Sequence, residues 1–241
     1  MGVTIHYSMS INNKENILPV LNALGDFARE LGAKEVSEIR HFDKSEIEAI
    51  TEDKDNEWWW SLPITYVEIP SNGSNYSTSV RVLPTEAYVV RIYPGEGCET
   101  AFFGFATYPE VITHKGEKYP TNLEGWSSSS FCKTQYSKDF TFCHKLVISL
   151  LRYLDSISSE NGMTVDVYDE AGYWEHGDDA VLKKIHHESQ IMIAAIAGTL
   201  IDSNAGDLLV TSILEDPNFE YIEMEGLESM ASRNVGNEIE W

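Results

Sequence analysis

The sequence predicts an α+β fold, a mostly antiparallel sheet with helices packed on one face, and three observations predict it. Residues 3–9 alternate apolar and polar side chains, as a half-buried strand does. Stretches rich in β-branched and aromatic residues follow through the middle of the chain, separated by Pro and Gly turns. Helical spacing of apolar residues begins again after residue 139. We expect one domain over residues 1–210 and an acidic, partly ordered tail over 211–241.

The first elements predict a β-α-β opening. Apolar residues from Ile17 to Leu31 recur at helical spacing, and Gly32 is placed to end that helix. Ala33 to Phe42 is then expected to return as a second strand. Residues 1–42 form either part of the single domain or a separate sub-lobe.

The middle of the chain predicts an exposed connection followed by a meander. Residues 43–57 carry seven acids and two lysines, which is typical of an exposed helix or a linker. Strands are expected over 76–83, 87–93, 99–107 and around 111–114, with turns short enough for hairpins. The serine-rich stretch from Gly125 to Ser130 is expected to be a flexible surface connection.

The C-terminal half predicts the order β-α-β-α. Asp139 can cap a helix that ends near Asn161 and Gly162. Residues 163–168 are expected to form a strand, and a second long helix is expected from about residue 178 to residue 201.

Charge and cysteine content limit the possible partners. The chain has 39 acidic and 17 basic residues and a formal net charge of -22, so its field repels nucleic acids and anionic membranes. A basic protein partner or a metal ion is the converse expectation, and a salt-adapted or merely highly soluble surface is the simpler interpretation. No apolar run approaches the roughly 20 residues of a membrane span. Cys98, Cys132 and Cys143 form no CxxC pair, which favours reduced thiols in the cytoplasm.

The segment from Asp169 to Asp179 is the first candidate for chemistry, because it gathers carboxylates and an imidazole where a strand ends and a helix begins. Asp169, Glu170 and His176 are candidate ligands of Mg²⁺ or Mn²⁺, since both ions prefer oxygen donors. Glu170 and Glu175 are the candidate catalytic carboxylates, with Glu175 able to act as a base.

The same segment has a simpler interpretation. The spacing matches neither HExxH nor an EF-hand loop. Asp178 and Asp179 can cap the following helix, and the rest can be a solvated turn. Trp174 is the candidate aromatic contact to a ligand, or else packs inward.

The turn from Tyr93 to Glu99 is the second candidate. Its two glycines permit close backbone approach, and Glu96 and Glu99 can project carboxylates toward a ligand. No lysine follows the pattern that a phosphate loop requires. A plain hairpin turn is the alternative.

The third candidate is the stretch from Phe131 to Tyr136. Strand alternation puts Lys133 and Gln135 on one face, where Lys133 can serve catalysis and Gln135 can bind a ligand. Lys133 can equally neutralise a neighbouring carboxylate. His6, on the more polar face of the first strand, is a further ligand-binding candidate.

Three motifs carry a resemblance: PGEGCE at 94–99, FCKTQY at 131–136 and DEAGYWE at 169–175. Together with the start Ile5-His6-Tyr7, they resemble a family of uncharacterised prokaryotic proteins. The resemblance covers most of residues 1–200 and implies a bacterial or phage source and a single shared fold. It implies no activity.

Two hypotheses of function follow. The first is a binding, accessory or inhibitor-type protein that covers a basic partner, motivated by the net charge and the acidic tail. The second is a divalent-cation-dependent hydrolase, in which the candidate residues converge on one carboxylate-rich pocket. We favour the first, because no motif in the chain specifies a reaction.

Overall fold

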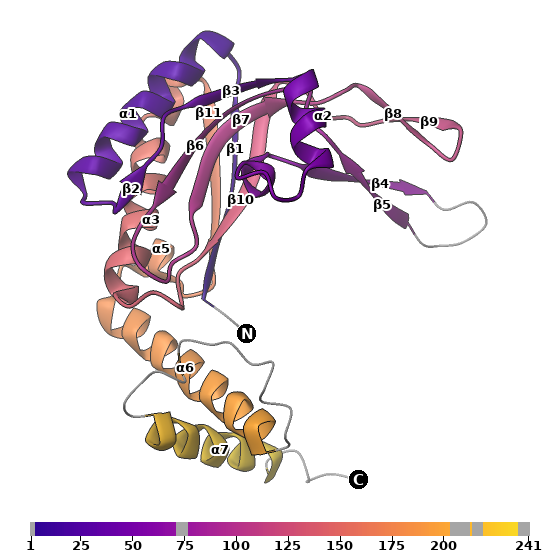
Figure 1. Ribbon diagram of the computed structural model, residues 1–241. Helices are drawn as coiled ribbons and strands as arrows, with labels where there is room; N and C mark the ends of the chain where they lie inside the picture. Colours follow the sequence, from indigo (N-terminus) through magenta and orange to yellow (C-terminus); the bar gives the residue numbers. More distant parts are fainter. Residues whose placement is uncertain (1–2, 71–76, 203–212, 214–218, 236–241) are drawn as a thin grey trace. The chain divides into compact units, whose positions relative to one another are not determined.

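The computed structural model describes residues 3–70, 77–202, 213 and 219–235, with 228–235 described by backbone alone (Figure 1). Contacts divide the chain into two compact units. The first, here called the sheet unit, is Thr4–Asp169, and the second, the helical unit, is Met1–Val3 with Glu170–Trp241. The division therefore falls at residue 169, and the boundary expected at residue 210 does not coincide with it.

The sheet unit is built on one antiparallel sheet with the strand order β11-β1-β10-β7-β6-β2, in which β3 also pairs with β6. Its strands are β1 (Thr4–Ile11), β2 (Glu35–Val36), β3 (Arg40–Asp43), β6 (Glu86–Tyr93), β7 (Ala101–Thr107), β10 (Trp126–Lys133) and β11 (Met163–Asp169). Two separate hairpins are formed by β4 (Thr65–Pro70) with β5 (Ser77–Val82) and by β8 (Val111–His114) with β9 (Glu117–Pro120).

Two long helices cover one face of this sheet (Figure 1). The helix α1 (Ile17–Glu30) buries a single apolar stripe and ends before Gly32, whose φ of 86° suits only a residue without a side chain. The helix α3 (Phe140–Ser156) is capped by the Asp139 side chain, which accepts from the Phe142 amide. The short α4 (Ser158–Asn161) ends at Gly162 in the left-handed conformation.

On the opposite face of the sheet, the described residues form a second core at the β6 and β3 end. The helix α2 (Lys44–Glu52) begins with a capping box between Asp43 and Glu46 and buries Ile47 and Ile50. It packs with the short turn η2 (Trp59–Ser61) and neighbouring residues into a second core. That core contains Phe42, Ile47, Ile50, Trp58, Leu62, Val82, Ala87, Val89, Ala106 and Tyr108.

Most predicted elements are confirmed. The β-α-β opening is present, although the second strand is split into β2 and β3, and residues 4–42 share the main sheet and form no separate lobe. The acidic stretch after residue 43 contains a helix, and the β-α-β-α order of the C-terminal half is found. The four strands of the predicted meander are present, but only β6 and β7 pair with each other. Because β5 pairs with β4 and β8 pairs with β9 in separate hairpins, the continuous meander was wrong.

The prediction for residues 125–130 was wrong. Residues 126–133 form β10, which lies between β1 and β7 inside the sheet. Serine is a weak strand former, but pairing on both sides decides the conformation here. Ser128 also donates a hydrogen bond of 2.6 Å to the Gly104 carbonyl on β7.

The helical unit contains α5 (Tyr173–His176), α6 (Asp179–Asp202) and α7 (Phe219–Val235). Ala194, Ala197, Ile213 and Ile222 form its small core. Part of the predicted acidic tail is thus helical, and the rest, apart from residue 213, lies outside the described residues. Within the described ranges, every helix is too short or too polar for a membrane span.

Candidate functional site

Strand alternation assigns the side chains of β10, β1 and β11 to two faces. In the paired rows, His6 stands opposite Phe131 on one side and Tyr168 on the other, while Ile5 stands between Cys132 and Asp169. Since successive side chains point to opposite faces, these two rows face opposite ways. The row with Ile5 is buried toward the helices, and the row with His6 is exposed.

The exposed row forms an aromatic strip across three neighbouring strands, here called the aromatic row (Phe131, His6 and Tyr168). The His6 ring centroid lies 6.1 Å from that of Phe131 and 6.0 Å from that of Tyr168. Phe131 is 48% exposed and Tyr168 is 65% exposed. Large aromatic side chains are normally kept from water, so a contiguous exposed set points to an interaction surface.

A polar row runs beside the aromatic row. Ser8 pairs with Ser129 on β10 and with Asp166 on β11, one step along from His6 on the same face. The two rows line a cavity of about 540 Å³, whose remaining wall includes Ile64. Asp166 is the carboxylate of this cavity.

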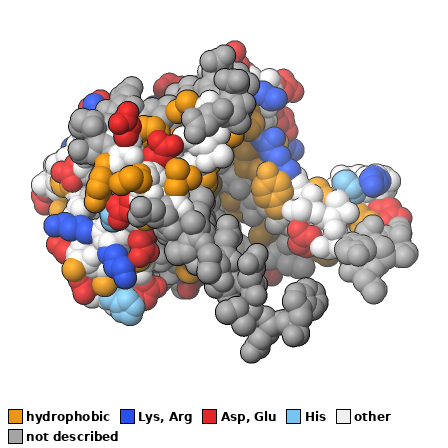
Figure 2. Space-filling view, turned by 90° about the horizontal axis from the view of Figure 1, so that it is seen from below, with side chains coloured by type: hydrophobic (Ala, Val, Ile, Leu, Met, Phe, Trp, Pro, Cys, Tyr) orange, Lys and Arg blue, Asp and Glu red, His pale blue; other side chains and the backbone are white. Residues whose placement is uncertain are grey.

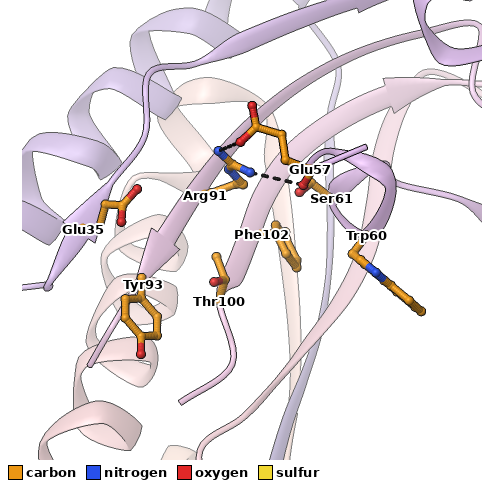
Figure 3. Close-up of a pocket in the computed structure, with 8 residues that line it drawn as sticks. All are labelled: Glu35, Glu57, Trp60, Ser61, Arg91, Tyr93, Thr100 and Phe102. Atoms are coloured by element: carbon orange, nitrogen blue, oxygen red, sulfur yellow. Dashed lines mark hydrogen bonds and ion pairs between the residues drawn. The ribbon is translucent and has the colours of Figure 1, made fainter. Parts of the chain in front are cut away.

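A second cavity of ≈ 440 Å³ lies toward β6 (Figure 3). The Arg91 guanidinium lies 3.8 Å from the centroid of the Trp58 ring and donates to the Glu57 side chain at 3.1 Å and to the Glu57 carbonyl at 3.2 Å. The cavity is lined by Glu35, Glu57, Trp60, Ser61, Arg91, Tyr93, Thr100 and Phe102. Trp60, at 75% exposed, provides a second accessible aromatic surface.

A small cavity of ≈ 30 Å³ lies between the two larger ones: it shares Trp60, Ser61 and Phe102 with one and Ser129 and Ser130 with the other. We call the three together the open-face groove. Ser61 is buried where it lines this groove, and its hydroxyl has no hydrogen-bond partner among the described residues. The oxygen itself is closed to solvent, so this hydroxyl faces protein atoms and not the open groove.

The predicted carboxylate segment, from Asp169 to Asp179, is divided between the two units. Asp169 is 4% exposed, on the face of the sheet that the helices cover, and its Oδ2 lies 3.2 Å from Nε2 of the buried His144 on α3. The other ring nitrogen of His144 shares a hydrogen bond of 2.9 Å with the Thr134 hydroxyl. This network joins α3 to β11 and to the end of β10.

The remaining members of that segment belong to the helical unit. Glu170, Glu175 and His176 are exposed and Trp174 is half-buried, the last three on α5. Among the described residues, no group of three or more His, Cys, Asp or Glu side chains is arranged to hold a metal ion. The residues predicted to bind Mg²⁺ or Mn²⁺ therefore do not form a ligand cluster in the described part of the chain.

The turn at 93–99 and the end of β10 do come together. Glu99 accepts from the Lys133 amide at 3.1 Å, and its carboxylate lies 3.9 Å from the Lys133 ammonium. Glu96 instead pairs with Lys138 at 2.7 Å, and Gln135 is buried. Lys133 thus neutralises a neighbouring carboxylate, which is the simpler of its two predicted roles.

The full predicted set does not form one pocket around His6. Alternation in β1 and β11 puts His6 on the exposed face and Asp169 on the opposite, buried face. Of the predicted residues, only His6 lines the open-face groove.

The three cysteines converge although they are far apart in sequence. The sulfurs of Cys98 and Cys132 lie 3.8 Å apart, and Cys143 accepts from the Ser137 hydroxyl at 2.9 Å. A hydrogen bond with Cys132 raises the pKa of the Cys98 thiol, and one with Cys98 raises the pKa of the Cys143 thiol. Because only a thiolate is a good nucleophile, this cluster is suited to packing and not to catalysis.

Sequence reasoning missed most of the groove. Phe131 and Tyr168 each alternate with a residue of the buried row, a pattern that marks the second face of the sheet, but only the register shows that His6 stands between them. Arg91 carries no signal of its own, since it reaches the cavity only after the chain has folded. Trp60 does belong to a run of three tryptophans, 58–60, which cannot all face one core from a regular element. Comparisons with protein-family models, with curated proteins and with solved structures found no match to this chain.

Proposed function

We propose that this protein is a binding protein of the inhibitor or accessory type, and that it covers a basic surface of another protein with its open-face groove. The observation that carries the proposal is the exposed aromatic row on a sheet whose other face packs against α1 and α3. Aromatic residues are enriched in protein interfaces, where they supply large contact areas at small entropic cost.

The net charge of -22 supports a basic partner. Acidic and basic side chains are interspersed on the face that Figure 2 shows, and neither sign fills a broad area there. The charge therefore acts as a general attractive field, which speeds encounter with a positively charged protein, while the groove supplies the specific contacts. Free thiols at Cys98, Cys132 and Cys143 support action in a reducing compartment such as the cytoplasm.

The hydrolase alternative has no comparable support. Its residues would need to share one pocket, whereas His6 and Asp169 lie on opposite faces of the sheet. No observation favours it over binding.

The proposal is tested by site-specific photocrosslinking. A benzophenone amino acid at position 131, in the groove, is compared with one at position 142, an exposed phenylalanine on the helix-covered side. We expect a basic protein to crosslink from position 131 and not from position 142. Equal crosslinking from both positions would overturn the assignment of the surface.

Once the partner has been purified, the Kd of the complex can be measured. We expect Phe131→Ser with Tyr168→Ser to raise Kd at least tenfold, as truncation of interface aromatics does, and Phe142→Ser to leave it unchanged. Raising the salt from 50 to 300 mM should slow association.

A further inference from the structure

We infer that the Tyr168 end of the open-face groove is a subsite for one arginine side chain of the partner, held between the aromatic row and the Asp166 carboxylate. This inference rests on the proposed function and specifies the chemistry that the groove recognises. It follows from three features of the site, taken in turn below.

The first feature is the accessible ring surface. Tyr168 is 65% exposed, and its ring centroid lies 6.0 Å from the neighbouring His6 ring, with the two planes at 33°. A planar guanidinium can lie over such a ring and be attracted by its negative face. Arginine does this better than lysine, whose compact ammonium holds its water more tightly.

The second feature is the carboxylate. Asp166 stands two residues before Tyr168 on β11, so both side chains project from the same face of the sheet. Asp166 is exposed, and no Lys or Arg within the described ranges forms an ion pair with it. A carboxylate beside an aromatic ring accepts the two parallel N–H bonds of a guanidinium that also stacks on the ring.

The third feature is the charge polarity of the cavity. The Lys133 ammonium lies 5.6 Å from the centroid of the Phe131 ring, so a cation of the protein itself already occupies that end of the aromatic row. Glu99, at 3.9 Å, offsets that ammonium charge, but the Phe131 ring is already covered, so an incoming guanidinium finds an open ring beside a carboxylate at the β11 end, where Asp166 lies. Ser8 and Ser129, in register between the two ends, offer hydroxyl oxygens as further acceptors.

The same features argue against an anionic ligand at this position. A phosphate or carboxylate group placed near Tyr168 would meet the Asp166 carboxylate at short range. In a chain with a net charge of -22, little compensates that repulsion. A cationic side chain is therefore the occupant that the geometry selects.

The test is an NMR titration of the full-length protein with the peptide acetyl-Gly-Arg-Gly-amide. The matched control peptide carries citrulline, which has nearly the shape of arginine and no charge. We expect the arginine peptide to shift the amide signals of Asp166, Tyr168 and His6, with millimolar affinity, and the citrulline peptide to bind at least fivefold more weakly. A lysine peptide should also bind more weakly than the arginine peptide.

Two variants locate the binding. Asp166→Asn should weaken the arginine peptide about fivefold, whereas Asp155→Asn, which makes the same change of charge on the exposed side of α3, should not. Tyr168→Leu, which keeps apolar bulk and removes the ring, should also weaken it. All three side chains are exposed, so the variants should fold normally. Unshifted NMR signals of the buried core will verify this.

The outcomes separate the inference from the proposed function. If the citrulline peptide binds as well as the arginine peptide, or if Asp155→Asn acts like Asp166→Asn, the subsite is wrong, even when a basic protein crosslinks from position 131. If the arginine peptide behaves as expected and no protein crosslinks from position 131, the subsite stands and the proposed function fails.

Discussion

At the scale of single residues, Asp169 shows how one side chain can carry a misleading signal. In the sequence it opens an acidic segment and resembles a metal ligand. In the structure it is buried and bonded to His144, which is itself bonded to Thr134. Burial of a charged group is costly unless it is paired, so this network is a structural connection between α3 and the sheet.

Removal of the Asp169 carboxylate should therefore destabilise the fold. We expect Asp169→Ala to lower the free energy of unfolding by about 3 kcal/mol, because the buried His144 loses its partner. Denaturant unfolding followed by circular dichroism measures this. Asp166→Asn, an exposed change on the same strand, should stay within about 0.5 kcal/mol of wild type. A variant Asp169→Ala as stable as wild type would show that the network contributes nothing.

At the scale of elements, the turn after β6 depends on one glycine. Gly97 has a φ of +80°, and a Cβ there would meet the Tyr136 carbonyl oxygen at 2.2 Å. The neighbouring backbone bonds the same two segments, since the Lys138 amide donates to the Glu96 carbonyl at 3.0 Å. The turn is thus held directly against the chain between β10 and α3, and a side chain at residue 97 has no room.

Gly116 provides the matched control for this position. Its φ of +87° is similar, but a Cβ there would meet nothing within 4 Å. We expect Gly116→Ala to cost about 1 kcal/mol for the backbone conformation alone, and Gly97→Ala to cost about 1 to 3 kcal/mol more for the clash. Thermal unfolding of both variants measures the difference. Equal losses would mean that the close approach to Tyr136 relaxes without cost.

The element β10 shows where local signals fail. Four consecutive serines, 127–130, predict a loop from propensity, yet they form an interior strand. Partners on both sides decide that outcome, and those partners are more than 15 residues distant in sequence, beyond the reach of a local pattern.

At the scale of the whole molecule, the net charge of -22 should make stability depend on salt. Like charges repel in the folded chain, and salt screens that repulsion. We expect the melting temperature at pH 7 to rise by about 2 to 4 °C between 20 and 200 mM NaCl, which corresponds to about 1 kcal/mol for a chain of this size. Differential scanning calorimetry measures the shift.

The control for this prediction is the same salt series near pH 4.5, the isoelectric point of the sequence, where the net charge is small and the shift should disappear. A rise of equal size at both pH values would assign the effect to general salting-out and not to charge repulsion.

The sequence by itself determined the α+β class, the order of the main helices and strands, the helix caps at Asp139 and Gly162, and the acidic character of the chain. These properties depend on near neighbours, because apolar periodicity, capping and turn chemistry all act within a few residues. It also indicated His6 and the pairing of Lys133 with a carboxylate.

Only the tertiary structure decided which faces meet. The register of β1 with β10 and β11 places His6 between Phe131 and Tyr168, and it turns Asp169 away from them toward His144. A shift of one residue would exchange the two faces, and nothing local in the chain fixes the register of strands so distant in sequence. The open-face groove exists because long-range pairing aligned side chains that the sequence keeps far apart.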